Sequence, residues 1–161
     1  MLWAALLGLV LVGCSDPVTV RVVDEKEFVQ ALQQHRGQVV LVDFWATWCL
    51  ECMELFPHTV ELHQRFADQG LAVVSLSFDD PSDEQTVLRF LDSKGATFDN
   101  YLSRYGGSTK SCEAFSLEDL ILPRWHLYDR TGTLRTVLRS SEYVIEPEDI
   151  DRAVEELLNE S

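Results

Sequence analysis

Two of the chain's four cysteines, Cys49 and Cys52, stand three positions apart in the segment WCLEC. This spacing is compatible with a metal site, a structural disulfide or a reactive thiol pair. A structural zinc site usually takes four ligands in two pairs, and the sequence contains no second Cys-x-x-Cys. A disulfide across two intervening residues removes little chain entropy, so it would stabilise the fold weakly. We therefore favour a redox-active pair, without metal or cofactor.

The position of the pair supports this interpretation. Residues 39–44 form a continuous apolar run of strand length, and a helical pattern begins at Cys49. At the first turn of a helix, free N–H groups and the helix dipole stabilise a thiolate. Cys52 lies one turn further along the same face, within bonding distance. We predict that Cys49 is the exposed nucleophile, and that Cys52 is more buried and resolves the mixed disulfide.

Strands and helices alternate along the rest of the chain. The patterns predict strands at 18–23, 39–44 and 71–78, helices within 24–37, 49–69, 79–95 and 146–158, and a hairpin within 123–138. Residues 96–122 are the least regular part. This order predicts an α/β fold of three layers, in which a mixed central sheet has helices on both faces. The irregular segment would be an insertion before the C-terminal hairpin.

The first residues of the chain indicate where in the cell the protein is located. Residues 1–13 carry no charge and include an apolar run that is too short to span a bilayer, which predicts a signal peptide. Their end, with Cys14, resembles the bacterial lipobox, in which the cysteine is lipidated. We expect residues 14–24 to contain a tether and the first strand, and 25–161 to form one domain. Lipidation of Cys14 would anchor the domain to a membrane in the cell envelope or periplasm.

The charge balance excludes some partners. The chain has 13 basic and 27 acidic residues and a net charge of −14. Nucleic-acid binding depends on basic side chains that neutralise phosphates, so we expect no nucleic-acid partner. The same balance argues against a basic patch that docks on anionic lipid.

The segment LVDFWATWCLEC, residues 41–52, closely resembles the active-site segment of thioredoxin-fold proteins, and Pro57 fits the same pattern. The resemblance extends over about residues 24–158. The long interval between Cys52 and Pro123, together with the lipobox, is similar to the TlpA/ResA-like extracytoplasmic thiol–disulfide oxidoreductases. The resemblance implies a thioredoxin-like fold and an enzyme that reduces protein disulfides through its dithiol. It also implies a membrane thiol as electron donor.

The resemblance assigns roles to further residues. Asp43 matches a buried acid that accepts a proton from Cys52, and burial should raise its pKa. Trp48 should cover one side of the site. Pro123 matches the family's cis-proline, which brings Leu122 against the cysteines, where its backbone can pair with an extended substrate segment.

Some features depart from the family pattern or leave alternatives open. The dipeptide Leu50-Glu51 lacks the proline common in the family, and a carboxylate beside Cys49 opposes its ionisation, which favours a reducing enzyme. A thiol peroxidase is one alternative, although Ala46 stands where peroxiredoxins place threonine. A lipoprotein that uses the fold only for binding is another. Cys112 is a resolving thiol for a second exchange, an intermolecular link or a spectator.

Overall fold

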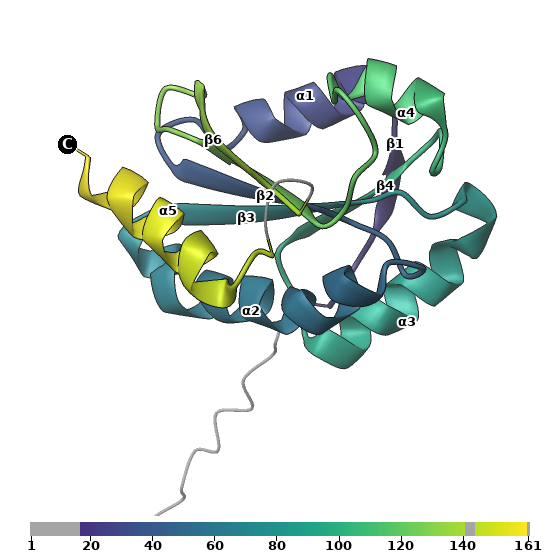
Figure 1. Ribbon diagram of the computed structural model, residues 1–161, viewed down its shortest axis with the longest axis horizontal. Coiled ribbons are helices and arrows are strands. Elements are labelled where there is room, and N and C mark those ends of the chain that lie inside the picture. Colours follow the sequence, from purple (N-terminus) through teal and green to yellow (C-terminus); the bar gives the residue numbers. More distant parts are fainter. Residues whose placement is uncertain (1–16, 141–143, 161) are drawn as a thin grey trace, which may run out of the picture.

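A six-stranded mixed sheet forms the centre of the protein (Figure 1). The computed structural model describes residues 17–140 and 144–160. The strand order is β1-β4-β3-β2-β5-β6. The strands are β1 (Arg21–Val23), β2 (Val39–Trp45), β3 (Leu71–Ser77), β4 (Asp99–Ser103), β5 (Arg124–Tyr128) and β6 (Leu134–Arg139). The first four pair in parallel, whereas β5 and β6 pair antiparallel to their neighbours.

Helices cover both faces of this sheet. They are α1 (Glu25–Gln33), α2 (Leu50–Phe66), α3 (Glu84–Lys94), α4 (Thr109–Ala114) and α5 (Pro147–Asn159), with 3₁₀ turns η1 (Ala67–Gln69) and η2 (Pro81–Asp83). In Figure 1, α1 and α4 lie above the sheet and α2, α3 and α5 lie below it. None of the helices in the described ranges is long and apolar enough to cross a membrane.

Strand β2 lies in the middle of the sheet, and all seven of its residues are buried. Its side chains alternate between the two apolar cores, as the period of a strand requires. Leu41 and Trp45 belong to the core beneath α2, α3 and α5, whereas Val42 and Phe44 belong to the core beneath α1. Asp43 therefore points toward α2. The next element after β2 is the helix that carries the cysteines.

Local signals explain where the helices next to the site begin and end. Asp24 caps α1 through a capping box with Glu27. Helix α2 continues past Pro57 because its apolar positions go on packing against the sheet down to Phe66. Gly95 ends α3 in the left-handed conformation, with φ of 67°, which glycine adopts at little cost.

The predicted fold class is confirmed, and two details of the prediction are wrong. Only Arg21–Val23 of the predicted first strand pairs with the sheet. The segment before the hairpin is not irregular, because it contains α4 and β4, and β4 lies between β1 and β3. The segment of β4 contains several polar residues, so it lacks the apolar pattern by which a strand inside a sheet is predicted. Buried Asn100 satisfies its side chain by accepting a hydrogen bond from Ser75 Oγ at 2.8 Å and by donating to two backbone carbonyls.

Candidate redox site

Cys49 and Cys52 form a disulfide at the N-terminus of α2. Their Sγ atoms lie 2.07 Å apart and their Cα atoms 5.3 Å apart. Cys49 is the N-cap residue, and its Sγ accepts a hydrogen bond from the backbone N–H of Cys52 at 3.2 Å. This N–H is one of the donors that a helix leaves free in its first turn. The same bond would stabilise a Cys49 thiolate when the disulfide is reduced.

The two sulfurs differ in accessibility. Cys52 is 2% exposed and belongs to the core beneath α2. Cys49 is partly exposed and lines a groove of about 580 Å³. The other residues that line this groove are Trp48, Leu50, Glu51, Leu120, Ile121, Leu122 and Ser140. A partner molecule therefore reaches Cys49 first.

Asp43 is a buried carboxylic acid in the layer between β2 and α2. It is 1% exposed and accepts a hydrogen bond from Thr59 Oγ1 at 2.6 Å. Trp125 Nε1 in turn donates to Thr59 Oγ1 at 3.3 Å. Burial raises the pKa of Asp43 to about 7, although the hydrogen bonds from Thr59 and Trp125 act in the opposite direction. A proton therefore enters or leaves this carboxyl group near neutral pH.

The loop before β5 forms another part of the groove wall, through Leu120, Ile121 and Leu122. The Leu122–Pro123 peptide bond is cis, as the resemblance implies. The carbonyl oxygen of Leu122 accepts a hydrogen bond from Ser140 Oγ at 3.1 Å, and that of Pro123 accepts one from the Ser140 N–H at 3.4 Å. Leu122 lines the same groove as Cys49.

A partly buried ion pair supports this loop. Arg124 is 1% exposed, and its Nη2 donates to Asp119 Oδ1 at 2.6 Å. The same carboxylate oxygen accepts the backbone N–H of Ile121 at 3.2 Å. Arg124 also lies 4.0 Å from Glu118, and Asp119 also pairs with Arg139 at 3.4 Å, so the pair belongs to a small network of charges. Arg124 therefore fixes the loop that presents Leu122 to the groove.

The structure places the predicted site residues around the groove in different ways, and Pro123 lines a neighbouring pocket that shares Glu51 with the groove. Cys49, Trp48 and Leu122 line the groove, whereas Asp43 and Cys52 lie behind it in the core. Trp48 is 59% exposed, whereas Trp45 is fully buried.

Cys112 does not lie in the groove. It sits in α4, half buried against the core beneath α1, and lines a separate cavity that also reaches Leu120.

Sequence reasoning misses three buried polar residues beside the site, namely Thr59, Asp79 and Arg124. Each has a weak signal in the sequence. Thr59 interrupts the apolar positions of the helix, Asp79 directly follows a buried strand, and Arg124 directly follows the proline before the hairpin. A polar residue at the end of an apolar run often lies at a site where strand ends meet.

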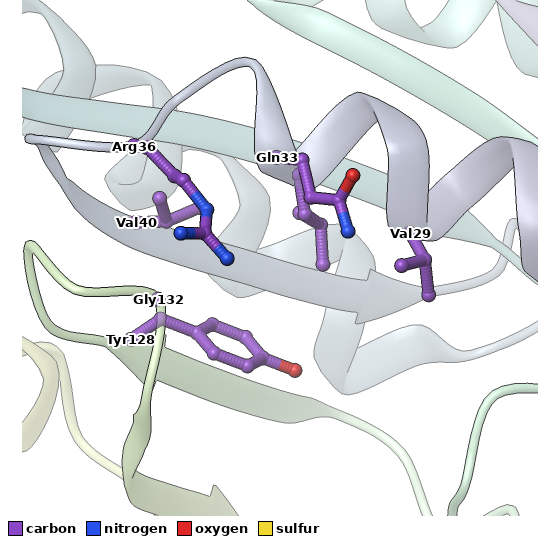
Figure 2. Close-up of a pocket in the computed structure, with 7 residues that line it drawn as sticks. Val29, Gln33, Arg36, Val40, Tyr128 and Gly132 are labelled. Atoms are coloured by element: carbon purple, nitrogen blue, oxygen red, sulfur yellow. The ribbon is translucent and has the colours of Figure 1, made fainter.

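A further cavity, of about 230 Å³, lies between α1 and the pair β2–β5 (Figure 2). Its lining residues are Val29, Leu32, Gln33, Arg36, Val40, Tyr128 and Gly132. Val40 lies near the start of β2, whereas Cys49 follows the end of that strand. This cavity therefore lies at the other end of the sheet and contains none of the predicted site residues. Within the described ranges, no group of three or more His, Cys, Asp or Glu residues is arranged to hold a metal ion.

The chain is similar to known thiol–disulfide oxidoreductases in sequence and in fold. Residues 19–89 match the thioredoxin family. Protein DipZ of Mycobacterium tuberculosis (strain CDC 1551 / Oshkosh) is 31% identical over 120 residues, which are 66% of this chain. This chain spans only 15% of the length of DipZ. The thiol–disulfide oxidoreductase ResA of Geobacillus kaustophilus (strain HTA426) is 27% identical over 148 residues, which cover 92% of this chain and 79% of ResA.

A solved structure agrees with these matches at the level of the fold. It is a secreted Mycobacterium tuberculosis disulfide oxidoreductase homologous to E. coli DsbE, with a TM-score of 0.60 and 17% identity, over 78% of this chain and 86% of that one. The fold of this chain is thioredoxin-like, and its Cys-x-x-Cys disulfide stands at the start of α2. In sequence the chain is similar to the thiol–disulfide oxidoreductase ResA, and in fold alone it is similar to the DsbE homologue.

Proposed function

We propose that this chain is a thiol–disulfide oxidoreductase that reduces protein disulfides outside the cytoplasm through Cys49 and Cys52. The observation that carries the proposal is the difference between the two sulfurs. Cys49 is partly exposed in an apolar groove, whereas Cys52 is 2% exposed behind it. This arrangement allows the Cys49 thiol to attack an external disulfide, while the Cys52 thiol is shielded until it resolves the mixed disulfide.

The proposed reaction begins with the reduced pair. The Cys49 thiolate attacks one sulfur of a substrate disulfide, and the other substrate sulfur leaves as a thiolate that takes up a proton. A mixed disulfide now joins Cys49 to the substrate. Cys52 loses its proton, for which Asp43 is the acceptor, and attacks Cys49 Sγ. The second substrate thiolate leaves, and the Cys49–Cys52 disulfide of the structure results.

The substrate segment would lie in the groove between Trp48 and Leu122. Leu122 lies just before the start of β5. An extended substrate segment beside the Leu122 backbone would be held by main-chain hydrogen bonds. Exposed apolar side chains at the rim, those of Trp48, Leu50 and Ile121, would contact the substrate on either side of its cysteine. This geometry favours a polypeptide over a small disulfide.

The proposed location is the outer side of a membrane, with Cys14 as the lipid attachment site. Cys14 lies outside the described residues, and the support is the lipobox-like sequence that it ends. One homologous solved structure is that of a secreted protein. A membrane thiol protein would return two electrons to the oxidised pair after each turnover.

Exchange of Cys52 for serine tests this function. The Cys52→Ser variant is expected to accumulate mixed disulfides between Cys49 and its substrates, because no resolving thiol remains to release them. Non-reducing gels and mass spectrometry of partners captured in cells would measure them. Cys49→Ser,Cys52→Ser is the matched control and should trap none. If Cys52→Ser captures nothing, and the wild-type protein does not reduce insulin, the proposal is wrong.

The direction of electron flow has its own test. Glu51 directly precedes Cys52 and places a carboxylate near Cys49, which opposes thiolate formation and favours a reducing pair. We expect a redox titration against glutathione to give a reduction potential well below about −200 mV. Glu51→Gln should move the potential toward more oxidising values. A wild-type potential well above this limit would identify an oxidant instead.

A further inference from the structure

A buried carboxylate outside the predicted site holds the loop in front of the cysteines. Asp79 lies just after β3 and is 2% exposed. Its Oδ2 accepts the backbone N–H of Thr47 at 2.9 Å and the hydroxyl of Ser77 at 2.6 Å. Its Oδ1 accepts the hydroxyl of Thr47. Two of the three donors to this carboxylate therefore come from one residue on the neighbouring loop.

The loop is the connection between β2 and α2. Thr47 is the residue before Trp48 and lies two positions before Cys49. The backbone N–H of Cys49 donates to the carbonyl of Ala46 at 3.1 Å, which closes the turn. The side chain of Asp79 fixes the middle of this turn, which lies beyond the last residue of β2 that pairs with a neighbouring strand. The backbone N–H and the hydroxyl of Thr47 both donate to this one side chain, so the connection is tight.

The loop determines where Trp48 stands. Trp48 is 59% exposed and lines the groove next to Cys49. Behind its ring lies Gly107, where an added Cβ would be 3.3 Å from Trp48 Cζ2 and 3.3 Å from the carbonyl oxygen of Phe78. The indole ring is therefore seated against backbone on one side, next to the strand end that carries Asp79. Its other side is open to the groove.

We propose that Asp79 is a positioning residue for substrate binding. Its carboxylate holds Thr47 so that Trp48 forms a fixed wall of the groove before a substrate arrives. Asp79 therefore determines how tightly a protein disulfide binds, and not how fast the sulfur atoms react. This inference rests on the proposed function, because it concerns the binding of protein disulfides in the same groove.

Asp79→Asn and Thr47→Val test the inference. The asparagine amide of the first variant would present an N–H group to the donors of Thr47, and the valine of the second would remove the hydroxyl while keeping the shape of the side chain. We expect the KM for insulin to rise about tenfold in Asp79→Asn and less in Thr47→Val, because the ordering of the loop would then have to occur on binding. We expect kcat, and the rate at which dithiothreitol reduces the Cys49–Cys52 disulfide, to change less than about twofold.

Ser75→Ala is the matched control for a loss of stability alone. Ser75 lies on the same strand, is fully buried and donates to Asn100, away from the loop. This variant should have a lower Tm and an unchanged KM. Gly107→Ala should raise KM without touching Asp79, because its Cβ would displace Trp48.

The outcomes separate the inference from the proposed function. A wild-type protein that does not reduce insulin would overturn the proposed function. An active wild type whose KM is unchanged in Asp79→Asn and Thr47→Val would overturn the inference alone, as would an equal rise of KM in Ser75→Ala. If Asp79→Asn does not fold, the KM of Thr47→Val decides whether the inference holds. This variant keeps the side chain of Asp79 and the donors to it other than the Thr47 hydroxyl.

Discussion

Exchange of Cys49 for serine is expected to reduce the rate of catalysed insulin reduction by at least about a thousandfold. In the proposed reaction the exposed sulfur forms the mixed disulfide, and a serine hydroxyl is not nucleophilic at neutral pH. The measurement is turbidity from precipitated insulin chains, with dithiothreitol as the reductant and the uncatalysed rate subtracted.

Cys112→Ser is the control for this experiment. Cys112 lies in α4 and lines a cavity other than the groove, so its exchange should leave the rate unchanged. The opposite pattern, an active Cys49→Ser and an inactive Cys112→Ser, would show that the exchange reaction starts at the other thiol. Such a result would refute the order of steps proposed for the pair.

The second large effect concerns stability. Asp43→Asn is expected to become more stable relative to the wild type as the pH rises, by about 2–3 kcal/mol between pH 5 and pH 9. Burial raises the pKa of Asp43 from its ordinary value of 3.8 to about 7 in the folded protein. The folded state therefore binds this proton more tightly than the unfolded chain does. The stability that the bound proton contributes is complete below about pH 4 and is lost as the pH rises through about 7.

Urea unfolding of the oxidised proteins at several pH values measures this difference. Asparagine keeps an oxygen that accepts the hydrogen bond from Thr59 but does not ionise. Asp92→Asn, on the exposed face of α3, is the control and should differ from the wild type by a similar small amount at every pH. Parallel pH profiles for the wild type and Asp43→Asn would contradict the raised pKa.

The parts of the protein that short sequence patterns specify could be predicted. The apolar run of β2 and the helical pattern after it place Cys49 at a strand-to-helix junction, because both signals are local. The cis bond at Pro123 agrees with the family resemblance. The catalytic role of Asp43 remains a prediction.

Contacts between distant segments could not be predicted. The bond from Thr59 to Asp43 joins α2 to β2, and the bond from Thr47 to Asp79 joins a loop to the end of another strand. Such pairs depend on the register of strands, which a single sequence leaves open. Strand β4 was not predicted for a related reason. Buried Asn100 makes the segment look like a loop until its partners are known.

The ion pair of Arg124 and Asp119 has a consequence for the choice of substrate. It holds the wall of the groove that contains Leu122, so this wall has little freedom to adapt when a partner arrives. Because this wall of the groove is rigid, the change of conformation on binding must occur in the substrate. The disulfides selected by such a groove lie in segments that can be drawn out as extended chain. Proteins that are still folding, or that have unfolded, present their cysteines in this form.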